Sequence, residues 1–331
     1  MKKTLILCAL AAATAAWADP YRVQVPLGAD YDGAMVYLVN FDTGANVDST
    51  LVEGGLALFE GQVDEPYIAR IIVDGSRYSQ FILEPGSISF NKQQRAFGSM
   101  LNDQKRAMND SVAGYTSRFR AAADDAAREA VYGEFMKFMQ TQMEQNLDNP
   151  IGYELFLDQA SSLSGDELAE ALRRYPMMAG YQRVAKLQEA ARRRAATGVG
   201  QKYTDFEVNG KKLSDYVGRD GHYLLVDFWA SWCGPCIRQT EVLKELYNKY
   251  KDKGLDVLGV AVWDKPEDTE AAIRNHNLPW ESILDAQTIP TDLYGISGIP
   301  CIMLIGPDGT ILSRDKQDDE LRADVARYLE K

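Results

Sequence analysis

A stretch in the C-terminal half of the chain, Tyr223–Trp229, is apolar on both of its alternating faces. A strand with this pattern lies inside a sheet that is covered on both sides, as in parallel sheets flanked by helices. A second apolar stretch follows at 255–263, and between the two apolar residues recur at helical spacing until Gly254. The sequence therefore predicts a βαβ unit.

The segment Trp232-Cys233-Gly234-Pro235-Cys236 stands where the first strand ends and the helix begins. Free backbone N–H groups at a helix N-terminus stabilise an anion, so the pKa of the Cys233 thiol is expected to fall. We therefore predict that Cys233 is a nucleophile. Cys236, one turn further on, is placed to attack a mixed disulfide formed at Cys233.

Asp227 lies on the same strand, between two apolar neighbours. Burial would raise the pKa of its carboxyl and fit it to accept a proton from Cys236 through a water. The alternative is an edge aspartate that faces solvent. The apolar strand around it favours the buried role.

Few side chains are available for a metal. Apart from Cys8, which lies in the leader discussed below, the cysteines are Cys233, Cys236 and Cys301, and the histidines are His222 and His276. A zinc site on the paired cysteines would need two further ligands from this small set. We expect neither a metal nor a bound cofactor.

The first residues predict an exported protein. Lys2 and Lys3 precede an apolar stretch, 4–16, that is too short to span a bilayer, and a small-residue cleavage site ends at Ala18. Such a leader places the mature chain in the periplasm as a soluble protein. Cys8 raises a lipoprotein alternative, which the Leu7 before it disfavours.

The charge of the chain limits its partners. The formal net charge is −12. Nucleic acid and anionic lipid are both bound through basic surfaces, so neither is expected as a partner. A run of arginines at 192–194 is read as the solvated end of a helix, with a docking patch as the alternative.

The residue patterns along the chain predict three parts after a leader at 1–18. Residues 19–91 carry short strands typical of a small antiparallel sandwich or barrel, and 92–197 read as helices. Residues 198–331 hold the α/β pattern, closing with a hairpin at 301–305 and 310–313 and a helix at 318–329. The expected N-terminal strands are 22–25, 34–39, 56–59, 68–73 and 79–83.

The stretch from Val226 to Cys236, followed by Gly298-Ile299-Pro300 and Pro307-Asp308-Gly309, resembles the thioredoxin superfamily. Within it the chain is most similar to the extracytoplasmic TlpA/ResA-like thiol–disulfide oxidoreductases, which also carry a segment like Thr204-Asp205-Phe206. The resemblance covers about residues 200–331. It implies a thioredoxin fold, a central mixed sheet flanked by helices.

The resemblance also implies roles for individual residues. Cys233 and Cys236 would cycle between dithiol and disulfide, and Pro300 would follow a cis peptide bond. The backbone of Ile299 would pair with the partner chain, and Trp232, Gly234 and Pro235 would contact it.

Two positions depart from the family pattern. Many relatives have an acidic residue where this chain has Gln239, so Asp227 would carry proton transfer alone. Threonine is frequent after the cis-proline, where this chain has Cys301. We read Cys301 as a small buried side chain, with a third redox thiol as the alternative.

The expected activity is reduction of protein disulfides, because Gly234-Pro235 between the cysteines resembles reducing thioredoxins. The expected partners are protein disulfide substrates and an upstream electron donor, for which a membrane-embedded protein is one option. A disulfide isomerase or oxidase, a thiol peroxidase and a partner-binding module are the alternatives. A peroxidase would need a proline and a threonine where Val226 and Ala230 stand.

The N-terminal part resembles a β-rich domain of unknown function. The resemblance rests on residues 47–61 and on Leu83-Glu84-Pro85-Gly86. This N-terminal domain offers no catalytic residues, and we expect it to recognise or orient a partner.

Overall fold

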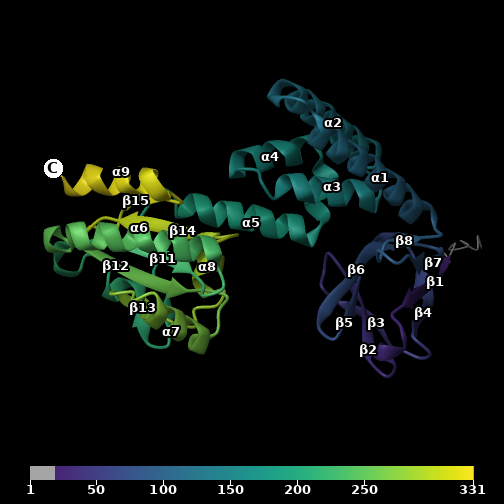
Figure 1. Cartoon of the computed structure of the whole chain (residues 1–331), viewed down its shortest axis with the longest axis horizontal. Helices are drawn as coiled ribbons and strands as arrows, with labels where there is room; N and C mark the ends of the chain where they lie inside the picture. Colours follow the sequence, from purple (N-terminus) through teal and green to yellow (C-terminus); the bar gives the residue numbers. More distant parts are fainter. Residues whose placement is uncertain (1–18, 331) are drawn as a thin grey trace, which may run out of the picture. The chain divides into compact units, whose positions relative to one another are not determined.

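The computed structural model describes residues 19–330, so the predicted leader at 1–18, including Cys8, lies outside the described residues. The chain divides into two compact units (Figure 1). One runs through Ser162 and includes Leu172–Val184, and the other comprises Leu163–Ala171 and Ala185–Lys331. The helices predicted at 92–197 are thus shared between the two units.

The first unit begins with two four-stranded sheets, β4-β1-β7-β8 and β3-β2-β5-β6. Inward-facing side chains from both sheets, among them Val23, Leu38, Phe59 and Phe81, form one core. Most neighbouring strands are antiparallel, as predicted, while β1 and β7 pair in parallel. The strands are β1 (Asp19–Pro26), β2 (Met35–Asn40), β3 (Asn46–Leu51), β4 (Leu56–Val63), β5 (Tyr67–Val73), β6 (Ser76–Leu83), β7 (Gly86–Phe90) and β8 (Ala96–Phe97).

Helices follow this β-rich part: α1 (Met100–Ala121), α2 (Asp125–Gln145), α3 (Pro150–Ala160), α4 (Gly165–Arg174) and α5 (Gln182–Ala196). The buried carboxylate of Glu84 marks the start of α1. It accepts hydrogen bonds from the backbone N–H groups of Leu101 and Asn102 at 2.8 and 3.0 Å. A carboxylate at this position stabilises the positive end of the helix.

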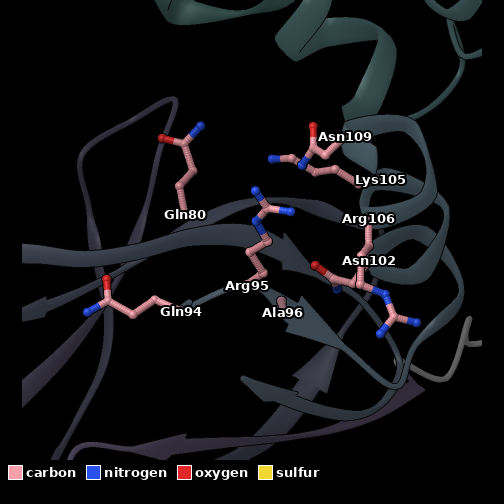
Figure 2. A pocket seen from close by; sticks show the side chains of 8 residues that line it. All are labelled: Gln80, Gln94, Arg95, Ala96, Asn102, Lys105, Arg106 and Asn109. Atoms are coloured by element: carbon pink, nitrogen blue, oxygen red, sulfur yellow. The ribbon is translucent and has the colours of Figure 1, made fainter. Parts of the chain in front are cut away.

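A polar pocket opens where β6 and the β7–β8 hairpin meet α1 (Figure 2). Its cationic residues each have a carboxylate partner: Lys105 pairs with Glu154 at 2.5 Å, Arg106 with Asp103 at 3.0 Å and Arg95 with Asp110 at 3.5 Å. The charges of the pocket are therefore balanced within the unit. It is lined by Gln80, Gln94, Arg95, Ala96, Asn102, Lys105, Arg106 and Asn109.

The second unit contains a five-stranded sheet in the order β13-β12-β11-β14-β15. The first three strands are parallel, β14 runs antiparallel to β11, and β15 runs antiparallel to β14. The elements are β9 (Glu207–Val208), β10 (Lys211–Lys212), β11 (Tyr223–Trp229), α6 (Gly234–Tyr250), β12 (Leu255–Ala261), α7 (Pro266–Asn275), β13 (Glu281–Ile283), α8 (Ile289–Tyr294), β14 (Cys301–Ile305), β15 (Ile311–Arg314) and α9 (Asp318–Leu329).

Both faces of this sheet are covered, which explains why β11 is apolar on both faces apart from Asp227. Leu225 and Trp229 face a core built with Leu243 of α6 and Leu321 of α9. Phe228 and the other alternating residues of β11 face a second core. The α/β part is therefore the thioredoxin fold that the sequence predicted.

The last turn of α5 is held by the second unit. The buried guanidinium of Arg314 donates to the carbonyl of Thr197 at 2.8 Å and to that of Tyr294 at 2.8 Å. Arg193 donates to the carbonyl of Asp292 at 2.8 Å, and Arg194 pairs with Asp315. The arginine run therefore lies at a largely exposed helix end, as predicted, and two of its side chains also anchor that end within the second unit.

Within the described range, none of the helices combines the length and the apolar character needed to cross a membrane.

Candidate active site

The predicted nucleophile stands at the start of α6. Cys233 is the N-cap residue, and its Sγ accepts a hydrogen bond from the backbone N–H of Cys236 at 3.2 Å. The two cysteines form a disulfide, and Pro235 sits in the first turn, where a missing N–H costs little. Cys233 is 4% exposed and Cys236 is fully buried. A reagent in solvent therefore reaches Cys233 first.

The loop before β14 lies beside this disulfide. The carbonyl oxygen of Ile299 is 3.8 Å from Sγ of Cys233. The peptide bond between Ile299 and Pro300 is cis. The fold thus brings together two segments that are far apart in the chain.

A second loop, which the sequence analysis missed, holds the residues before Cys233. The buried carboxylate of Asp264 accepts hydrogen bonds from the backbone N–H of Ser231 at 2.7 Å and from its hydroxyl at 3.0 Å. Thr269 donates to the same carboxylate at 2.8 Å. The signal available in the sequence was an aspartate just beyond the end of a strand next to β11, where the carboxyl ends of parallel strands meet.

Trp232 presents its ring to solvent from this loop. Its side chain is held by a hydrogen bond from Nε1 to the carbonyl of Trp263 at 3.0 Å, yet the residue is 62% exposed. Trp263 itself has a φ of 55°, an uncommon conformation for a bulky residue. Gly234 and Pro235 are also exposed. These residues form a partly apolar rim around the disulfide.

Asp227 lies on the face of the sheet that also carries the disulfide. It stands between Leu225 and Trp229 on β11, and both of these residues belong to the core that includes Cys233 and Cys236. The residue is 2% exposed, and burial raises the pKa of its carboxyl to about 7. A carboxyl with this pKa exchanges protons readily near neutral pH.

Comparisons with known proteins agree with this geometry. Residues 199–314 match the AhpC/TSA family, and residues 21–104 match a domain of unknown function, DUF4369. The thiol–disulfide oxidoreductase ResA of Geobacillus kaustophilus is 28% identical over 127 residues, which are 38% of this chain and 71% of that protein.

Solved structures are also similar to this part of the chain. A thiol–disulfide oxidoreductase from Bacteroides fragilis is 32% identical, and the match covers 39% of this chain and all of that one, with a TM-score of 0.35. The thioredoxin domain of a thiol–disulfide oxidoreductase from Bacteroides vulgatus is 29% identical over 40% of this chain and 96% of its own, with a TM-score of 0.34. The C-terminal part of the chain is thus related to the thioredoxin-fold thiol–disulfide oxidoreductases.

Gln239 is one of the two positions at which the sequence departs from the pattern that the resemblance implies. Its side chain is buried and makes a reciprocal pair with Asp318, donating to the carboxylate at 2.8 Å and accepting from the backbone N–H at 3.2 Å. Gln239 therefore ties α6 to the start of α9. In this oxidoreductase Asp227 is the acidic group buried in the core that holds the dithiol.

Cys301 faces away from the disulfide. It belongs to the core on the opposite side of the sheet from Cys233 and Cys236. Burial, assisted by a hydrogen bond to Asp315, raises the pKa of its thiol well above the usual value. A protonated, buried thiol is a poor nucleophile.

Within residues 19–330 we find no group of three histidine, cysteine or acidic side chains placed to hold a metal ion.

Proposed function

We propose that this oxidoreductase reduces disulfides in periplasmic proteins through Cys233 and Cys236. One observation carries the proposal. The sulfur of Cys233 lies at the N-terminus of α6, 3.8 Å from the Ile299 carbonyl, while the preceding Trp232 is exposed and Cys236 is fully buried. This arrangement favours attack by Cys233 on a partner that docks over the loop.

The first step joins the two proteins. In the reduced enzyme, the Cys233 thiolate attacks one sulfur of the substrate disulfide. A new S–S bond forms to Cys233 as the substrate S–S bond breaks, and the leaving sulfur departs as a thiolate that takes a proton from water. The backbone N–H of Cys236, which bonds the Cys233 sulfur at 3.2 Å, would stabilise the attacking anion.

The second step releases the substrate. The Cys236 thiol gives its proton to Asp227, through a water, and its sulfur attacks Sγ of Cys233. The intramolecular disulfide forms, and the second substrate sulfur leaves as a thiolate. Two electrons have then passed to the substrate, and an upstream dithiol donor must return two electrons to the enzyme.

The proposed compartment rests on the leader. The basic residues Lys2 and Lys3, the short apolar stretch and the small-residue site ending at Ala18 predict export and cleavage. Mass spectrometry of the protein recovered from periplasm should find Asp19 at the N-terminus. A chain that retains residues 1–18, or that carries a lipid on Cys8, would contradict this part of the proposal.

The reduction potential of the Cys233–Cys236 couple tests the direction of electron flow. Equilibration against dithiothreitol or glutathione, with thiol trapping and mass spectrometry, gives this value. A potential near about −270 mV is expected for a reductant, whereas about −120 to −180 mV would favour an oxidase or isomerase.

Two comparisons separate the remaining alternatives. Insulin reduction should be lost in the Cys233→Ser variant, and unchanged activity would favour a module that only binds partners. Consumption of hydrogen peroxide by the reduced wild-type protein should be no faster than by a free thiol. Rapid consumption would favour a thiol peroxidase.

A further inference from the structure

Several buried polar atoms cluster on the face of the sheet that α6 covers. Among the described residues, Oδ1 of Asp227, Nε1 of Trp229, Nε1 of Trp280 and Oγ of Ser282 have no hydrogen-bond partner in the protein. Trp229 and Trp280 belong to the same core as the disulfide. An unpaired buried polar group costs about 1–3 kcal/mol, so four of them on one face of a sheet call for an explanation.

The strand register brings these groups into one row. Asp227 of β11 pairs with Gly259 of β12, and Gly259 pairs with Ser282 of β13. Residues that pair directly across parallel strands project from the same face, and adjacent strands lie about 4.8 Å apart. Gly259 therefore separates the carboxyl of Asp227 from the hydroxyl of Ser282 without placing a side chain between them.

The other polar atoms converge above Gly259. A Cβ atom at this position would lie 2.8 Å from Oγ of Ser282, 3.1 Å from Nε1 of Trp229 and 3.5 Å from Nε1 of Trp280. The backbone of Gly259 is ordinary strand, with no positive φ. Glycine is needed here for the space it leaves, not for its conformational freedom.

We propose that this space is an internal binding site for one water molecule. The water would accept hydrogen bonds from the indole N–H groups of Trp229 and Trp280, bond to the hydroxyl of Ser282 and donate to Oδ1 of Asp227. Buried waters in proteins make about three such bonds, and this site offers both donors and acceptors.

The site deepens the proposed function, because it acts on the group that would take the proton from Cys236. A hydrogen bond donated to a carboxylate favours its ionised form. The bound water would therefore oppose the rise in the pKa of Asp227 that burial causes. Trp280 and Ser282 are positioning residues in this proposal, since neither touches the reacting sulfurs.

Nuclear magnetic resonance of the oxidised full chain tests the site without any turnover. We expect a nuclear Overhauser effect between water and the indole N–H of Trp229 or Trp280. Its sign should be that of a water molecule that stays bound while the protein tumbles. The indole of Trp232, whose N–H is bonded to the Trp263 carbonyl, is the internal reference. Absence of transfer to both buried indoles would overturn the proposal.

Variants connect the water to Asp227. Gly259→Ala should remove the water signal, and Ser282→Ala should weaken it and raise the pKa of Asp227 by about half a unit, measured from the carboxyl carbon. Ser282→Ala carries the test if Gly259→Ala does not fold. Ser313→Ala is the matched control, because its buried hydroxyl donates to Asp324 on another part of the unit. An unchanged pKa in Ser282→Ala would contradict the assigned role, whether or not the enzyme reduces disulfides.

Discussion

The carboxylate of Asp264 accepts hydrogen bonds from both the backbone N–H and the hydroxyl of Ser231. This contact joins the loop after β12 to the loop that carries Trp232 and Cys233. The Trp263 carbonyl adds a third bond by accepting from the Trp232 indole. The proposed docking surface is therefore held from the side by the loop after β12.

Asp264→Ala should loosen this surface. We expect a loss of about 2–3 kcal/mol in the free energy of unfolding, because buried donors lose a charged acceptor. The KM for a protein disulfide should rise. The reduction rate of a small disulfide should fall by a smaller factor. Urea unfolding and steady-state kinetics measure the two effects. The exposed Asp268→Asn is the control, and equal losses with both classes of substrate would contradict a role in docking.

Asp227 predicts a particular pH dependence of stability. Its pKa is about 7 in the folded protein and about 4 in an unfolded chain. The folded state therefore binds the proton more tightly, and stability falls as the pH rises from 4 to 7, by up to about 4 kcal/mol. Above about pH 7 ionisation of Asp227 is expected to cause no further loss of stability.

Asp227→Asn should remove this slope and be more stable than the wild type at pH 8. Trp229, Trp232, Trp263 and Trp280 all lie in the second unit, so tryptophan fluorescence of the chain cleaved after Ala18 reports the unfolding of that unit. Parallel pH profiles for the variant and the wild type would show that the carboxyl is not the titrating group.

Cys236→Ser should trap the first step of the reaction. Cys233 would still attack a substrate disulfide, but no sulfur would be placed to release the product. Intact mass spectrometry should then find a covalent adduct with the substrate, which dithiothreitol removes. The Cys233→Ser variant should form none, and an adduct there would reverse the assigned order of the cysteines.

The end of α5 should contribute to the stability of the oxidoreductase unit. A fragment that begins at Gly198 leaves the buried Arg314 without the carbonyl of Thr197, to which it donates at 2.8 Å. We expect it to be about 2–3 kcal/mol less stable than a fragment that begins at Ala185. Equal midpoints in urea would contradict this. Arg314→Lys in the longer fragment is the control, and it should lose part of the difference.

The parts of the fold that depend on local pattern were predictable from the sequence. The strand at 223–229, the hairpin after Pro300 and the terminal helix at 318–329 follow from apolar alternation and turn residues, and the structure contains all three. Strand β3 was missed, because it lies at a sheet edge and has no buried residue to give it a periodic signal.

The parts that depend on which strands become neighbours were not predictable. The pairing of Asp264 with Ser231, and the row that joins Asp227, Gly259 and Ser282, exist only once β12 lies between β11 and β13. Nothing local marks these residues as partners. The arginine run at 192–194 likewise has an ordinary helix-end composition, and its contacts depend on the distant segments that hold Asp292 and Asp315.

Because Cys301 is buried, its thiol can be used to measure how often the second unit opens. Once the disulfide has formed, Cys301 is the one free thiol among residues 19–330. A thiol reagent can reach it only when the sheet separates from the elements that cover it, so the labelling rate counts how often the unit opens. Comparing the labelling rate with and without a docked partner would show how much the partner reduces opening of this unit.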